Sequence, residues 1–141
     1  MPKPILNRLF GIGNIPKTAL PILEAEGILV SDEGIKGWLK IRHLKMPGKY
    51  SSGKSSSFIG SLVLTRKRLA GYVFGKRQIN ILLDDPRMAA VEIELAKPNQ
   101  ISIAFDLAVF HENWNGHLGY KFKTDKAREF YDNIKNNPHH V

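Results

Sequence analysis

Residues 58–73 read FIGSLVLTRKRLAGYV, and this stretch decides the fold class. It contains two runs with a period of two, separated by the basic residues 66–68. The alternating positions are Phe58, Gly60, Leu62 and Leu64 in the first run and Leu69, Gly71 and Val73 in the second. Because successive side chains of a β-strand point to opposite faces, this period predicts two strands. The short run between them predicts a turn that joins antiparallel neighbours.

Five further segments repeat the two-residue period. They cover residues 35–41, 79–83, 91–95, 101–107 and 118–122. Short turn formers separate most of them, namely Gly75-Lys76, Asp84-Asp85-Pro86, Lys97-Pro98-Asn99 and Asn115-Gly116. Residues 46–57 are rich in Gly, Ser and Lys, so we expect a loop between the first two strands. The sequence therefore predicts seven antiparallel strands.

Helical signals flank the strands at both ends of the chain. In the first 27 residues Thr18 is the expected N-cap, with Pro21 in the first turn and Gly27 as the stop. Near the other end Thr124 is the expected N-cap, Asp125 lies in the first turn, and Asn136 and Pro138 end the helix. The apolar stripe of this second helix comprises Ala127, Phe130, Tyr131 and Ile134.

Seven antiparallel strands with one apolar face need a partner layer or closure to hide their edges. A single C-terminal helix can cap one open end of a strongly bent sheet. The predicted fold class is therefore mainly β with a C-terminal α-helix: a seven-stranded bent sheet or partly open barrel, capped by that helix and preceded by a short helical segment. With 141 residues and 43% apolar content we expect one domain over residues 28–136, an N-terminal strap or helix over 1–27 and a tail over 137–141.

Two motifs carry a resemblance to a known family. The run Gly60-Ser61-Leu62-Val63-Leu64-Thr65-Arg66-Lys67-Arg68-Leu69 resembles the pattern G-x-L-x-L-T-x-x-R-L of GRAM-like domains, and Lys36-Gly37-Trp38-Leu39 resembles the opening of a pleckstrin-homology (PH) first strand. The resemblance to this PH-like superfold, with its GRAM-like and bacterial PH-like members, covers residues 28–136. Phe130 and Tyr131 stand where many PH domains have a Trp, which favours a GRAM-like relative. The family implies phosphoinositide binding in many members, through the loop between the first two strands, and protein binding in others.

The charge of the chain is concentrated in one block. Residues 34–83 contain eleven Lys and Arg and no Asp or Glu, whereas the rest of the chain has ten basic and thirteen acidic residues, so the formal charge of +8 is local. There is no cysteine, which fits a reducing compartment. No signal-peptide h-region and no run of 18 apolar residues is present. The expected location is the cytoplasm, with peripheral association at a membrane.

The first predicted strand places a basic row on one face. Alternation puts Lys36, Trp38, Lys40 and Arg42 opposite Leu39 and Ile41. The expected loop adds Lys45, Lys49 and Lys54 among serines and glycines. Lys and Arg supply charge-assisted hydrogen bonds to phosphate, and Trp suits a membrane interface. These seven residues are the predicted binding site for an anionic headgroup.

Two other basic segments are weaker candidates. Arg66, Lys67, Lys76 and Arg77 form a secondary basic cluster that we expect to divide between two ends of the sheet, while Arg68 is expected to make a structural contact. The first dozen residues interleave Ile5, Leu6, Leu9, Phe10 and Ile12 with Lys3 and Arg8. This stretch fits either a membrane anchor or, as we favour, a strap over the barrel.

Catalysis is not expected. His111 and His117, with Asp106 nearby, are the one cluster of His and carboxylate residues, and their spacing does not fit a helical zinc pair. Gly11-Ile12-Gly13 lacks the third glycine of a dinucleotide loop. The sequence therefore predicts a non-enzymatic binding module with no metal and no cofactor.

Three partner classes remain open. The favoured partner is an acidic phospholipid or membrane surface. The second is an acidic protein that docks on the basic loop or on an open sheet edge. The third is nonspecific nucleic acid, which could stack on Trp38, Tyr50 and Phe58 at a sequence pI of 9.8.

Overall fold

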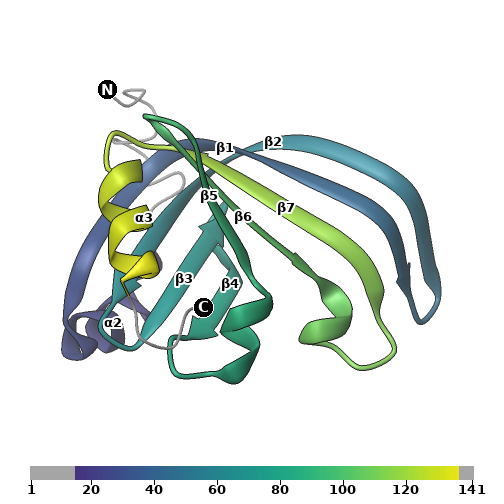
Figure 1. Ribbon diagram of the computed structural model, residues 1–141, viewed down its shortest axis with the longest axis horizontal. Coiled ribbons are helices and arrows are strands. Elements are labelled where there is room, and N and C mark those ends of the chain that lie inside the picture. The colour runs from purple at the N-terminus through teal and green to yellow at the C-terminus, as the bar shows by residue number, and fades with distance from the viewer. Residues whose placement is uncertain (1–14, 137–141) are drawn as a thin grey trace.

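The computed structural model describes residues 15–136, and for residues 49–52 it describes the backbone only. The described chain forms seven strands and four helical segments (Figure 1). The strands are β1 (Ile28–Met46), β2 (Lys49–Thr65), β3 (Arg68–Val73), β4 (Lys76–Leu82), β5 (Glu92–Lys97), β6 (Gln100–Asp106) and β7 (Asn115–Lys123). The α-helices are α2 (Leu20–Glu26) and α3 (Ala127–Lys135), and the 3-10 helices are η1 (Pro86–Ala90) and η2 (Leu107–Val109). The apolar stretch 3–12 and the predicted helix end at Pro138 lie outside the described residues.

All seven strands pair antiparallel in one sheet with the order β4-β3-β2-β1-β7-β6-β5. The sheet is strongly bent, and β4 and β5 form its two unjoined edges (Figure 1). Helix α3 packs against β5 and β6. The predicted fold class is confirmed: a mainly-β chain with one bent, unclosed sheet, a short N-terminal helix and a C-terminal helix.

The predicted loop over residues 46–57 is wrong, because this segment continues the β1–β2 hairpin. The two strands pair as far as Met46 and Lys49, and Pro47-Gly48 makes the turn, with φ of 76° at Gly48. From Lys49 to Phe58, β2 has β1 as its one described strand neighbour, since its pairing with β3 begins at Gly60. Serine, glycine and lysine suit such an exposed edge. In the sequence alone this composition is also typical of a loop, which explains the wrong prediction.

The main core lies between the inner face of the sheet and α3. Phe122 and Phe130 are fully buried there, and the ring of Phe122 meets that of Phe58 edge to face at 5.4 Å between centroids. The helix adds Ala127 and Ile134, so the predicted apolar stripe is confirmed, with Tyr131 at its margin. Aliphatic residues of β1 to β6 complete the core.

A second, smaller cluster covers the outer face of two strands. Ile15 and Leu23, before and within α2, pack on Val63, Ala70 and Tyr72 of β2 and β3. The part of β2 that pairs with β3, and β3 itself, are therefore buried on both faces, which explains why their side chains lack a polar alternation. The described part of the N-terminal segment acts as a strap on this part of the sheet. The outer face of β1, β7, β6 and β5 is left exposed.

The helix ends agree only partly with prediction. Gly27 stops α2 with φ of 84°, as expected, but the N-cap is Ala19 and not Thr18. The N-cap of α3 is Lys126, and Thr124 instead makes the preceding turn, where its Oγ1 accepts a hydrogen bond from the Lys126 amide at 3.1 Å. Asn136 ends α3 as predicted. The hydroxyl of Thr124 also donates to Asp32 Oδ2 at 2.7 Å, which ties this turn to β1.

Candidate functional site

Alternate residues of β1 form a basic row on the outer face of the sheet. Lys36, Trp38, Lys40 and Arg42 are exposed, whereas Leu39 and Ile41 between them are partly buried. Trp38 is 37% exposed, a large fraction for an indole in the middle of a strand. The structure therefore places these four predicted residues on one face.

The strand pairing brings further residues to the same face. Trp38 lies opposite Lys121 of β7, Lys40 lies opposite Gly119, and Arg42 lies opposite His117. Directly paired residues share a face of the sheet. Lys121 thus joins the row, and we call Lys36, Trp38, Lys40, Arg42 and Lys121 the outer basic face. Lys121 was missed because nothing local in the sequence shows that β7 lies beside β1.

A hollow of about 500 Å³ opens in this surface between β1, β7 and β6. Lys40, Arg42, Lys121 and Trp38 line it on one side, and small residues form its floor. The floor residues are Ser102, Ala104 and Gly119. A Cβ at Gly119 would meet no atom nearer than the Lys40 carbonyl oxygen at 4.0 Å, so packing does not require glycine there. The missing side chain leaves this central hollow open.

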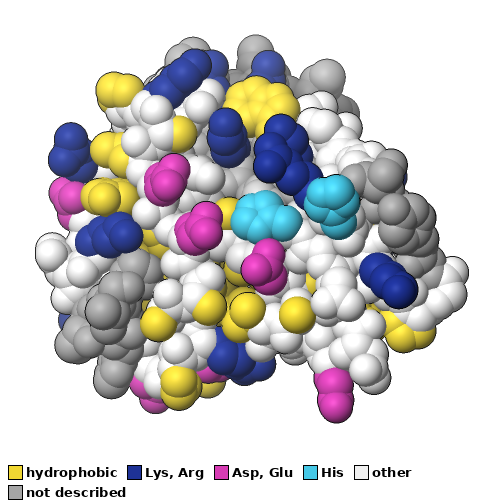
Figure 2. Space-filling view, turned by 45° about the vertical axis from the view of Figure 1, so that its right-hand side comes forward, with side chains coloured by type: hydrophobic (Ala, Val, Ile, Leu, Met, Phe, Trp, Pro, Cys, Tyr) yellow, Lys and Arg dark blue, Asp and Glu magenta, His cyan; other side chains and the backbone are white. Residues whose placement is uncertain are grey.

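The charge of the outer face changes sign across the sheet. Acidic residues lie on β5 and β6, where Glu92 lines the central hollow and Asp106 Oδ1 is 3.1 Å from His117 Nδ1. Figure 2 shows the basic side chains beside an exposed hydrophobic group, with the acidic side chains in a row below them and histidines between. An anion is therefore attracted toward β1 and repelled from β5.

A second hollow, of about 280 Å³, lies at the other end of the basic row. Lys36, Trp38, Ile59 and Phe74 line it. Phe74 is 60% exposed and belongs to the two-residue turn between β3 and β4. No sequence argument had selected Phe74. The signal was available, because an aromatic residue precedes glycine at a turn position where a small polar residue is usual.

Of the three predicted loop residues, the structure separates Lys54 from the row. Lys45 is exposed. It follows an irregular stretch of β1, in which His43 has a φ of 52° and the pairing with β7 shifts between Arg42 and Lys45. Lys54 is paired with Ile41, so it lies on the opposite face from Lys40. The side chain of Lys49 lies outside the described residues. The segment predicted as a loop is a strand pair, which puts Lys54 on the other face of the sheet from the row.

The secondary basic cluster is divided, as expected from its turns. Arg66 and Lys67 form the β2–β3 turn, whereas Lys76 and Arg77 follow the β3–β4 turn at the opposite end of β3. All four are exposed. Lys76 and Arg77 thus lie at the end of β3 that carries Phe74.

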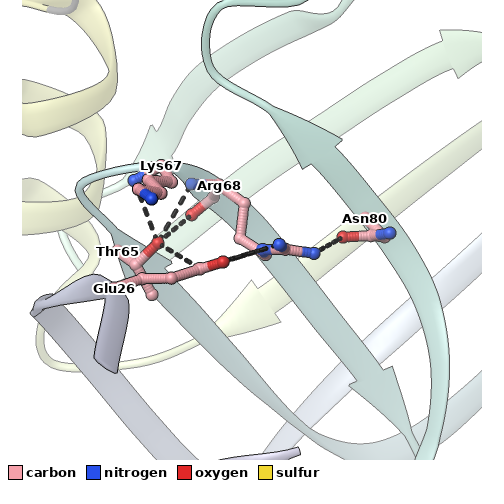
Figure 3. A network of polar contacts seen from close by, with 5 residues as sticks. All are labelled: Glu26, Thr65, Lys67, Arg68 and Asn80. Atoms are coloured by element: carbon pink, nitrogen blue, oxygen red, sulfur yellow. Dashed lines mark hydrogen bonds and ion pairs between the residues drawn. The ribbon is translucent and has the colours of Figure 1, made fainter. Parts of the chain in front are cut away.

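Arg68 makes a structural contact and is not part of the outer basic face. Its Nη2 donates to Glu26 Oε2 at 2.6 Å, and its Nη1 donates to Asn80 Oδ1 at 3.1 Å (Figure 3). The buried hydroxyl of Thr65 donates to Glu26 Oε1 at 2.9 Å and accepts from the amides of Lys67 and Arg68. The hydrogen bonds from Arg68 hold the pKa of Glu26 below its usual value, against the opposing effect of burial. The network joins α2 to the β2–β3 turn.

The two histidines of residues 111–117 lie apart and each has an identified neighbour. The His111 ring stacks on Trp114 at 4.3 Å between centroids, and His117 pairs with Asp106. Among residues 15–136, no three His, Asp or Glu side chains come together as a metal site. Burial raises the pKa of Tyr120 to about 12, and its hydroxyl donates to Gln78 Oε1 at 2.9 Å, a structural role.

These features define a small mainly-β protein with one open outer face that is basic along β1 and acidic along β5. In the described part of the chain, no helix is both long and apolar enough to cross a bilayer. No protein-family model, curated protein or solved structure matches the chain.

Proposed function

We propose that this chain is a non-enzymatic PH-like, GRAM-related binding module that associates with acidic phospholipid headgroups through the outer basic face. The observation that carries the proposal is a set of exposed cations without partners. The side chains of Lys36, Lys40, Arg42 and Lys121 form no hydrogen bond or ion pair with another described residue, and Trp38 lies among them. Their charge is therefore available to an external anion.

The expected strength of this attraction is moderate. Each Lys or Arg near an acidic leaflet contributes about 1 kcal/mol, and the effect decays within a Debye length. Four cations would contribute about 4 kcal/mol, which corresponds to a dissociation constant on the order of 1 mM. Binding by charge alone would be weak and sensitive to salt.

The central hollow supports a specific place for the headgroup phosphate. Lys40, Arg42 and Lys121 approach it from β1 and β7, and Glu92 lies across it on β5. The carboxylate would repel a phosphate toward the cations. The same acidic edge would tilt β5 away from an acidic bilayer and bring β1 toward it.

Neutralising two cations of the outer basic face is expected to weaken vesicle binding about thirtyfold. The variant Lys40→Gln with Arg42→Gln removes about 2 kcal/mol of attraction. Binding is measured by co-sedimentation with phosphatidylcholine vesicles, with and without phosphatidylserine, over a salt series. The control is Lys97→Gln with Arg128→Gln, which makes the same charge change at two exposed residues of β5 and α3.

Two outcomes would contradict the proposal. One is absence of binding to acidic vesicles at low salt. The other is equal loss in the two variants, because binding would then depend on net charge and not on this face. If a single-stranded oligonucleotide bound more tightly than the vesicles, with the same dependence on Lys40 and Arg42, the face would be a nucleic-acid surface instead.

Filling the central hollow is a second test that leaves the charge unchanged. Gly119→Gln is expected to weaken binding to acidic vesicles about tenfold, the value of one charge-assisted hydrogen bond to phosphate. Its control is Gly53→Gln on β2, where a Cβ would also have room, its nearest contact being the Ile41 carbonyl oxygen at 3.8 Å. Equal affinity of Gly119→Gln and wild type would show that the headgroup does not enter the hollow.

A further inference from the structure

Phe74 occupies a backbone position that disfavours a large side chain. Val73 pairs with Lys76, so Phe74 and Gly75 form a two-residue turn, and both have positive φ, 50° and 79°. These angles are those of a type I′ turn, where Asn and Gly are preferred. A bulky L-residue with positive φ is an outlier. The turn itself therefore does not explain a phenylalanine.

Core packing does not explain it either. Phe74 is 60% exposed, the highest fraction among the large hydrophobic residues that the structure describes. In contrast, Phe58 and Phe122 on the inner face are almost fully buried. The side chain of Phe74 thus has a backbone cost without a matching gain from burial within the described chain. Such a residue is explained when an external apolar phase covers it.

The surroundings of Phe74 indicate what that phase is. Phe74 and Trp38 line the same hollow with Lys36, and the exposed residues Lys76 and Arg77 begin β4 directly after the turn. None of the described residues that line this hollow is acidic. Two aromatic side chains beside exposed cations match the interface of an acidic bilayer, where the rings lie at headgroup level and the ammonium groups meet phosphate. If the partner were an acidic protein with an apolar pocket, nothing would require the two aromatic groups to lie at the edge of a broad basic face.

We infer that Phe74 and Trp38 form an aromatic anchor that inserts into the headgroup region of an acidic membrane. The inference rests on the proposed function and adds to it the apolar contribution that four cations lack. The anchor sets the orientation of the protein: the β3–β4 turn and the Lys36 end of the row penetrate, and Arg42 and the central hollow lie along the membrane surface. The strap residues Ile15 and Leu23 pack on the neighbouring part of the same outer face, and neither of them lines the hollow of Phe74 and Trp38.

The decisive variant is Phe74→Asn. If Phe74 is a membrane anchor, this substitution weakens binding without lowering stability, whereas a Phe74 needed by the fold would give a loss of stability. Asn fits the turn, so the thermal midpoint is expected to rise or stay unchanged. Binding to phosphatidylserine vesicles is expected to fall about tenfold, because an inserted aromatic group is lost. The matched control is Leu82→Asn, which removes a 44%-exposed apolar residue at the end of β4 remote from this turn and is expected to leave binding unchanged.

A second measurement reports insertion directly. In a protein with Trp38→Phe and Trp114→Phe, the variant Phe74→Trp carries one tryptophan at the turn. Its emission is expected to shift to the blue on acidic vesicles and to be quenched by a lipid-borne quencher. Unchanged binding of Phe74→Asn, or emission that stays that of a water-exposed indole on bound vesicles, would overturn the anchor and leave the electrostatic proposal intact. Wild-type protein that does not bind acidic vesicles would overturn the proposed function and the anchor with it.

Discussion

Replacement of Gly60 by alanine is expected to destabilise the protein by about 3 kcal/mol, at the upper end of the range for overpacked sites. A Cβ at this position would lie 2.2 Å from the carbonyl oxygen of Tyr72 and close to the Phe58 ring. The clash is with backbone, so no side-chain rotation relieves it. β2 and β3 would have to separate where their pairing begins, at Gly60 and Val73. Urea denaturation of the wild type and the variant measures the change in the free energy of unfolding.

The control is the same substitution where space exists. Gly119 lies in β7 of the same sheet, and a Cβ there would be 4.0 Å from its nearest neighbour, the Lys40 carbonyl oxygen, so Gly119→Ala causes no clash. This variant is expected to be as stable as the wild type or more stable by about 0.5 kcal/mol, because alanine restricts the unfolded chain. If Gly60→Ala lost no more stability than Gly119→Ala, the close approach of β2 and β3 would not be as described.

The structure gives physical reasons for each part of the motif that suggested a GRAM-like relative. Gly60 allows the close approach of β3, and Leu62, Leu64 and Leu69 are fully buried core residues. The Thr65 hydroxyl accepts hydrogen bonds from the amides of the following turn, and Arg68 donates a hydrogen bond to Glu26. Since all these roles are structural, the motif bears on the fold and not on a ligand. The family assignment stays a prediction.

The strands could be predicted because each one has a buried inner face, so apolar residues recur at every second position within the strand itself. The elongated tip of the β1–β2 hairpin could not, because backbone pairing alone holds Ser55 and Ser56 in β2 and no apolar pattern marks them. The basic row on β1 was predictable for the same local reason as the strands. Lys121 and Gly119 depend on the pairing of β1 with β7, which are distant in the sequence, and only the topology brings them to the row.

The position of α2 decides which surface is available for binding. Ile15 and Leu23 bury the outer face of β2 and β3. The exposed part of that face therefore begins beside them, at the basic and aromatic residues of β1 and of the β3–β4 turn. The attachment of α2 therefore affects the candidate site even though Glu26 and Arg68 do not belong to it. Weakening that attachment is expected to reduce overall stability, because the strap and the β2–β3 turn share one network.

The variant Glu26→Ala is expected to lower the free energy of unfolding by about 3 kcal/mol near neutral pH. It removes the carboxylate that accepts from Nε and Nη2 of Arg68 and from the buried hydroxyl of Thr65, at a site where the Glu26 side chain is 9% exposed. The control is Glu24→Ala on the same helix, which is exposed and is expected to change stability by less than about 0.5 kcal/mol. Equal effects of the two substitutions would contradict a structural role for the network.

The pH dependence of the Glu26→Ala effect tests the charge of the carboxylate separately from its packing. The pKa of Glu26 is lowered in the folded protein, first by hydrogen bonds from Arg68, whereas the unfolded chain titrates near the usual value of 4.5. The unfolded state therefore binds the proton more tightly, and the stabilisation from ionised Glu26 is fully present above this value. It is lost as the pH falls below 4.5 toward the folded pKa. The difference in unfolding free energy between wild type and Glu26→Ala should be constant near neutral pH and shrink in acid, and a difference independent of pH would show that the side chain stabilises the helix by packing alone.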